Sequence, residues 1–173
     1  HPRPDRHRDS WLCLNGTWDF EIDNALVGKA KKFYDRDSLD AKITVPFCPE
    51  SRLSGVAHTD FMNAVWYRRD LDIPADWAGK RVIFHIDACD YKTTLYINGK
   101  KVGTHSGGYT SFQFDITDYL SPEGNYATIY AEDDLRSEKQ VSGKQSHALG
   151  SYGCYYTRTT GIWQTVWLEA VEP

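Results

Sequence analysis

The stretch Asp90–Thr117, DYKTTLYINGKKVGTHSGGYTSFQFDIT, decides the fold. At its centre lies Asn98-Gly99, the strongest short signal for a β-hairpin, because the tight turn needs positive φ at both central residues. A period of two enters this turn and leaves it, and after Gly107-Gly108 it resumes towards Ile116. The residues that carry it are Thr93, Leu95, Ile97, Val102, Thr104, Phe112 and Phe114. One face of the stretch is therefore apolar and has to be covered by a second sheet.

The two glycines after the hairpin have a different interpretation. Gly107-Gly108 is not followed by a helical pattern, so it does not resemble a dinucleotide-binding loop. We interpret the pair as a bend, or a close backbone approach, at a corner of the sheet.

The two-residue period recurs along most of the chain, in runs separated by turn residues. These runs occupy residues 14–23, 43–45, 64–74, 81–88, 126–132 and 161–171. With the hairpin they give about eight to ten short strands and almost no helical periodicity, which predicts an all-β jelly-roll β-sandwich. The run 81–88 is apolar on both faces, which predicts a central strand. The run 161–171 is predicted to be one strand that closes the sheet. Core positions are expected for Trp18, Phe112 and Trp163.

Length and composition place limits on the architecture and the partners. The 173 residues fit one domain, residues 1–173, that begins with a basic N-terminal arm at residues 1–10. Twenty basic and 24 acidic residues give a formal charge of −4, which provides no general attraction for nucleic acid or an anionic membrane. No apolar run approaches the roughly 18 residues of a membrane span, so no membrane partner is expected.

The four cysteines share neither C-x-x-C nor cysteine–histidine spacing, so we expect free thiols and no metal site. They are Cys13, Cys48, Cys89 and Cys154. Free thiols favour a reducing compartment, and we expect a cytoplasmic location. The alternative is a periplasmic or secreted protein, if a leader precedes His1.

The sequence contains no motif that indicates a nucleophile elbow, a phosphate-binding loop or a zinc protease, and no cofactor is expected. The acidic run Glu132-Asp133-Asp134 lies at a strand end, and we interpret it as the solvated start of a loop. That loop, Asp133–Ser151, is long, polar and poor in aliphatic residues, and we expect it to be loosely held. Directly after it come Tyr152, Tyr155 and Tyr156, whose aromatic faces could stack on a sugar.

Several of these segments occur in the order found in a known family. PRPDRHRDSWLCLNGTWDF, VPF, VWYRRDLDIP, LYINGKKVG, GGYTSFQFDIT and TRTTGIWQTVWLE resemble the N-terminal sugar-binding domain of glycoside hydrolase family 2, which includes β-galactosidases, β-glucuronidases and β-mannosidases. The resemblance implies a galactose-binding-domain-like sandwich. In the family an immunoglobulin-like domain follows, and then a (β/α)8 barrel that carries both catalytic glutamates. The resemblance therefore implies a carbohydrate substrate and these two domains as partners, with no catalytic residue in this chain.

The resemblance also indicates which residues of this chain would contact a substrate pocket. In β-galactosidases and β-glucuronidases this domain lends the active site an aspartate, six residues before the glycine of the closing G-I motif. Counting back from Gly161 reaches Tyr155, so the chain departs from the pattern of those two specificities. We take Lys144, Gln145, Tyr155 and Arg158 as the candidate pocket contacts. The alternatives to a pocket-shaping domain are a free-standing carbohydrate-binding module and a structural spacer.

Overall fold

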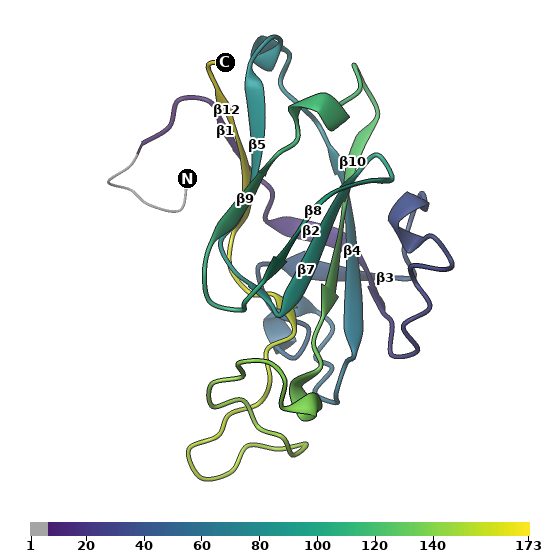
Figure 1. Ribbon diagram of the computed structural model, residues 1–173, viewed down its shortest axis with the longest axis vertical. Coiled ribbons are helices and arrows are strands. Elements are labelled where there is room, and N and C mark those ends of the chain that lie inside the picture. Colours follow the sequence, from purple (N-terminus) through teal and green to yellow (C-terminus); the bar gives the residue numbers. More distant parts are fainter. Residues whose placement is uncertain (1–6) are drawn as a thin grey trace.

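The protein is a sandwich of two antiparallel sheets, and the computed structural model describes residues 7–173 (Figure 1). The six-stranded sheet has the order β3 (Ala41–Val45), β2 (Gly16–Ile22), β4 (Ala64–Leu71), β10 (Asn125–Glu132), β7 (Lys92–Ile97), β8 (Lys100–Ser106). The four-stranded sheet has the order β1 (Trp11–Cys13), β12 (Val166–Val171), β5 (Arg81–Ile86), β9 (Phe112–Asp115). Two short strands, β6 (Cys89–Asp90) and β11 (Gly161–Ile162), pair separately. This architecture confirms the predicted all-β sandwich, with β5 central in its sheet.

Five short 3-10 helices lie in the connections between the described strands. They are η1 (Phe33–Asp35), η2 (Arg52–Ser54), η3 (Ala75–Trp77), η4 (Thr117–Tyr119) and η5 (Leu135–Ser137). None of the helices in residues 7–173 is long and apolar enough to span a lipid bilayer. Most of the predicted N-terminal arm, residues 1–6, lies outside the described residues. Within the described part, the Arg8 guanidinium pairs with Glu169 at 2.7 Å, and Glu169 also bonds His85 of β5 at 2.9 Å.

The hairpin at the centre of the chain forms as its sequence predicts. Asn98 and Gly99 have φ of 51° and 72°, and β7 pairs with β8 on either side of them. The Asn98 side chain adds a role that the turn rule does not contain, because it fastens the turn to the next connection. Its amide donates to Tyr119 O at 3.0 Å and to Asn125 Oδ1 at 2.8 Å.

At Gly107 and Gly108 the chain passes from one sheet to the other. β8 belongs to the six-stranded sheet and β9 to the four-stranded sheet, so the organising stretch supplies strands to both layers. Gly107 has φ 129°, and a β-carbon on Gly108 would lie 2.6 Å from the Asp90 carboxyl carbon. The chain therefore bends at Gly107, as predicted, and the group that lies close to the backbone at Gly108 is the side chain of Asp90.

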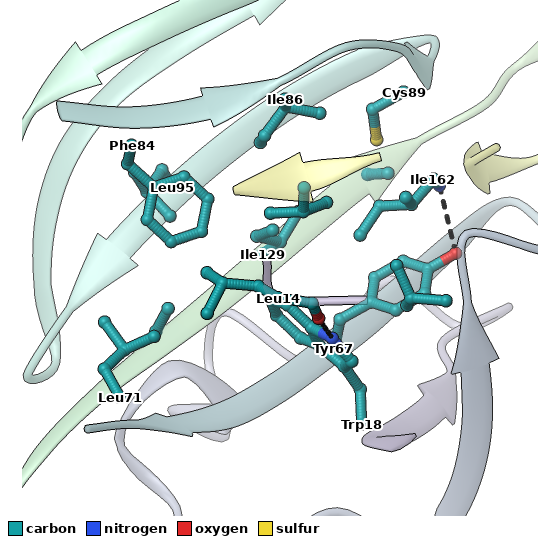
Figure 2. Packing of buried hydrophobic residues seen from close by; sticks show 14 of the residues in the cluster. Leu14, Trp18, Tyr67, Leu71, Phe84, Ile86, Cys89, Leu95, Ile129 and Ile162 are labelled. Carbon is teal, nitrogen blue, oxygen red and sulfur yellow. Dashed lines mark hydrogen bonds between the residues drawn. The ribbon is translucent and has the colours of Figure 1, made fainter. Parts of the chain in front are cut away.

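The core is formed by the alternate residues that each sheet turns inward. Trp18, Tyr67, Phe84, Leu95 and Ile129 are each at most 1% exposed and lie together between the layers (Figure 2). A second cluster of buried residues packs on β4, β7 and β10, beside η1, around Trp66 and Tyr130. Trp18 is a core residue as expected, while Phe112 and Trp163 are only partly buried.

The closing run 161–171 is not the single strand that its alternation predicts. It divides into β11 and β12, with Trp163–Thr165 outside both strands. The reason is that the two halves have different partners: β11 pairs with β6, and β12 pairs with β1 and β5. Between them the Trp163 indole donates to Gly108 O at 2.8 Å, which fixes the break against the sheet corner.

Candidate functional site

A loop that protrudes at the end of the sandwich opposite the C-terminus carries most of the exposed tyrosines (Figure 1). We call residues 141–156 the tyrosine segment. Tyr152, Tyr155 and Tyr156 are 51%, 39% and 44% exposed, and the rings of Tyr152 and Tyr155 stack with centroids 5.1 Å apart. Tyr109, from the β8–β9 connection, brings its hydroxyl to 3.5 Å from that of Tyr156. This end of the molecule therefore offers aromatic faces and hydroxyls together, a combination that suits a sugar.

The tyrosine segment is closed at its base by backbone hydrogen bonds and by one buried arginine. Ser146 N–H donates to Tyr156 O at 2.7 Å, and Tyr156 N–H donates to Lys144 O at 2.9 Å. Arg158 is 3% exposed and lies over the Phe61 ring, 4.1 Å from its centroid. Its guanidinium donates to four carbonyls, those of Thr59, Ser146, Ala148 and Leu149. Arg158 thus ties the segment to the connection before β4.

The tyrosine segment is held at two stems, the first at Gln145 and the second at Thr159 and Thr160. A buried carboxyl group, that of Asp90, holds the first stem. Gln145, 1% exposed, donates its side-chain amide to Asp90 Oδ2 at 2.7 Å. The Gln145 carbonyl oxygen accepts from Thr159 N–H at 2.8 Å, so this one side chain links Asp90 to both stems. Burial, followed by the charge of Asp133, raises the pKa of the Asp90 carboxyl to about 7.

Two more buried carboxyl groups hold the second stem at Thr160. Its N–H donates to both oxygens of Glu50, at 3.0 and 3.2 Å, and its hydroxyl donates to Asp133 Oδ2 at 3.0 Å. Asp133 also accepts from the Gln140 amide at 2.6 Å. Burial raises the pKa of both Asp133 and Glu50, and their hydrogen bonds offset part of that rise. We call Asp90, Asp133 and Glu50 the carboxyl cluster.

The interpretation of Glu132-Asp133-Asp134 as a solvated loop start is wrong for Asp133. Asp133 is 5% exposed, because Thr160 and Gln140 from later parts of the chain fold over it. Of the three aliphatic residues in the loop that follows, one is buried and two are exposed. Leu135 is 3% exposed, whereas Val141 and Leu149 are 69% and 63% exposed.

Three of the four predicted pocket contacts, Lys144, Gln145 and Tyr155, lie in the tyrosine segment, and the fourth, Arg158, lies at its base. Lys144 and Tyr155 are exposed. Gln145 and Arg158 are buried and donate hydrogen bonds to other groups of the protein. Contact of these four residues with a substrate remains a prediction. Among residues 7–173 no group of three or more His, Cys, Asp or Glu side chains is placed to hold a metal ion.

Sequence reasoning did not identify the roles of Asp90, Glu50 and Tyr109. The hydrogen bonds of Asp90 and Glu50 join them to Gln145 and Thr160, 55 and 110 residues further along the chain. The one available signal was Gly107-Gly108, which indicated that some group approaches the backbone closely there.

The chain matches the family described as glycosyl hydrolases family 2, sugar binding domain, over residues 12–168. A β-galactosidase of Thermoanaerobacter pseudethanolicus is 33% identical over 114 residues, which are 65% of this chain and 14% of that protein. A β-glucuronidase of Paenibacillus borealis is 27% identical over 133 residues, which are 76% of this chain and 22% of that protein. The chain therefore spans less than a quarter of the length of these curated relatives.

Solved structures of similar proteins share the fold. The β-glucuronidase of Lactobacillus rhamnosus superposes with a TM-score of 0.76 at 20% identity, over 96% of this chain and 30% of that one. The β-glucuronidase of Bacteroides uniformis superposes with a TM-score of 0.69 at 28% identity, over 94% of this chain and 18% of that one.

Proposed function

This chain belongs to the sugar-binding domains of glycosyl hydrolase family 2, and from that membership we propose that it is the non-catalytic N-terminal domain of a family 2 β-glycosidase. In this proposal residues 133–158 shape the sugar pocket of a (β/α)8 barrel domain of the same protein, with an immunoglobulin-like domain between the two. The observation that carries it is the tyrosine segment, which exposes three tyrosines while its base is buried and fastened.

The local charge of the segment also supports a role in contact with an acidic catalytic site. The tyrosine segment, residues 141–156, contains Lys144 and no acidic residue, a formal charge of +1 in a chain of −4. Glycosidases of this kind work with a pair of carboxyl groups, so a locally basic neighbour is electrostatically suited to their site.

The test is a kinetic comparison in the longest protein that the gene encodes. Tyr155→Ala should lower kcat/KM for an aryl β-glycoside by about tenfold, the equivalent of about 1.4 kcal/mol of transition-state binding. Leu26→Ala removes another exposed apolar side chain, on the connection after β2, and should leave kcat/KM unchanged. Unchanged kinetics for Tyr155→Ala would favour the spacer role.

One observation favours a second candidate, a free-standing carbohydrate-binding module. The exposed, stacked pair Tyr152 and Tyr155 could bind a sugar without any other domain. Titration of the chain alone with methyl β-glycosides, followed by NMR, separates the two. Saturable shifts confined to the tyrosine segment support the module, and no shift at 20 mM sugar supports the pocket-shaping domain.

We propose a cytoplasmic location for this protein. The support is that Cys13, Cys48, Cys89 and Cys154 are all free thiols. Alkylation of cells quenched in acid tests it, because a reducing compartment leaves all four thiols available for labelling once the protein is denatured.

A further inference from the structure

Asp90 has the least hydrogen-bond support of the three carboxyl groups that hold the tyrosine segment. Asp133 accepts from two side chains, and both oxygens of Glu50 accept from Thr160 N–H. Within residues 7–173, Asp90 accepts a hydrogen bond only from Gln145, and its Oδ1 is buried without a hydrogen-bond partner. Since the whole residue is 1% exposed, bulk water does not reach its carboxyl group unless the site opens.

The groups that face Asp90 make a negative charge there costly. Asp133, at the end of β10, and Glu50, in the connection after β3, are acidic neighbours. Cys89 precedes it on β6, and Tyr109 faces it from the β8–β9 connection. The cation of the site, Arg158, acts on Asp133.

The packing leaves Asp90 little freedom to move away from these neighbours. Gly108 lies against its carboxyl so closely that a β-carbon would overlap it. The Trp163 indole holds Gly108 from the other side through its carbonyl oxygen. The Asp90 carboxylate can therefore move away from these acidic neighbours only if Gln145 and the stems behind it move.

We propose that Asp90 is a proton-sensitive positioning residue, which holds the stems of the tyrosine segment through Gln145 and Thr159 when it is protonated and loosens them when it ionises. When the segment is closed, Asp90 is buried among acidic neighbours. When the segment opens, the Asp90 carboxylate is exposed to water. The inference concerns only how the segment is held, so it stands whether or not the segment meets a sugar.

The direction of the pH dependence follows from the pKa of Asp90, which is about 7 in the closed structure against 3.8 for the free side chain. A carboxyl whose pKa is raised by folding contributes its full stabilisation below the unfolded pKa and loses it as pH rises through the folded pKa. The segment is therefore held more firmly at pH 5.5 than at pH 8.

Hydrogen exchange of residues 141–160 tests this in the intact chain. Asp90→Asn keeps an oxygen for the Gln145 amide and carries no charge at any pH, so comparison with wild type at each pH cancels the intrinsic pH dependence of exchange. The ratio of wild-type to variant exchange rates should rise about thirtyfold from pH 5.5 to pH 8, the equivalent of about 1.5 pKa units, because the effect saturates once the pH passes the folded pKa of about 7. Asp118→Asn, which removes an exposed carboxyl after β9, should behave as wild type.

A ratio that stays flat from pH 5.5 to pH 8 overturns the proposal, and so does an equal effect of Asp118→Asn. Should Asp90→Asn not fold, the side-chain carboxyl carbon of Asp90 can be assigned and titrated by NMR in the wild-type chain. A midpoint above pH 6 supports the proposal, and a midpoint near pH 4 overturns it.

Discussion

The hydroxyl of Tyr67 fills the space that a β-carbon on Gly161 would occupy. Tyr67 is fully buried on β4, and its hydroxyl accepts a hydrogen bond from Ile162 N–H at 3.2 Å (Figure 2). Gly161 itself has φ 71°. The glycine of the closing G-I motif is thus required twice, by its backbone conformation and by the tyrosine that lies against it.

Gly161→Ala should therefore destabilise the domain by about 3 kcal/mol, from strained φ together with overpacking. Gly124→Ala is a matched control, because Gly124 has φ 70° and open space around its missing β-carbon. The control should lose about 1 kcal/mol, the cost of the backbone conformation alone. Urea unfolding measures both, and equal losses would show that the Tyr67 contact contributes nothing.

Arg158→Lys should destabilise the chain by about 3 kcal/mol, because one ammonium cannot replace a buried guanidinium that donates to four carbonyls. Arg136→Lys is the control: Arg136 also lies over the Phe61 ring but is exposed, so its loss should stay within about 0.5 kcal/mol. Urea midpoints separate the two variants. If Arg158→Lys leaves stability unchanged but impairs sugar turnover in the longest protein that the gene encodes, Arg158 is instead a direct substrate contact.

Asn98→Gly should cost about 2 kcal/mol although glycine suits the turn conformation. The variant retains positive φ but loses the hydrogen bonds of the Asn98 side chain to Tyr119, Asn125 and Tyr126. Asn98→Asp retains the acceptor for Tyr126 N–H and should lose less. Thermal unfolding of the two variants gives the comparison, and a neutral Asn98→Gly would mean that turn conformation alone matters.

The four thiols should react with an aromatic disulfide in three phases at pH 8. Cys13 and Cys154 are exposed and should react first. Burial, followed by the charge of Glu50, raises the pKa of Cys48 to about 11, so its reactive thiolate is scarce and it should react slowly. Cys89 is buried with its pKa raised to about 12, and should react only after unfolding. Replacing Cys13 and Cys154 by serine should remove the first phase, and a fast phase that persists would contradict this order.

Limited trypsin digestion should cut first after Lys139 and Lys144, which are exposed on the loop after β10. Arg158, six residues before Gln164, is buried and should resist until the chain unfolds. The two fragments should remain associated, because β12 pairs with β1 and β5 from the other side of the cut. Mass spectrometry of the first products identifies the sites, and an early cut after Arg158 would mean that the base of the segment is open.

The features predicted from the sequence are those set by neighbours in the chain. Asn98-Gly99 specifies its own turn, and alternation along β2 and β4 places Trp18 and Tyr67 in the core, because period and φ are local properties. Alternation could not show that 161–171 divides at Trp163, since both halves keep the same period. What divides them is the choice of partner strand, a long-range property.

The candidate site shows the same limit more strongly. The exposed tyrosines were found because they cluster in sequence, but the carboxyl cluster that holds them was not. Asp90, Asp133 and Glu50 come from three separate parts of the chain. Each is of a residue type that usually lies on the surface, so none of them alone indicates a buried site. Their burial depends on Gln145 and Thr160, which approach only in the folded protein.

The edge strands of the two sheets affect how readily the protein aggregates. The four-stranded sheet ends in β1 and β9, of three and four residues, which are too short to offer a long template for another chain. The six-stranded sheet ends in β3, which carries Lys42, and in β8, which carries Lys100 and Lys101 next to a register shift between Leu95 and Tyr96 of β7. Lysines and irregular pairing at an edge oppose strand addition by a second molecule. The domain is thereby protected against edge-to-edge aggregation while it is concentrated or newly synthesised.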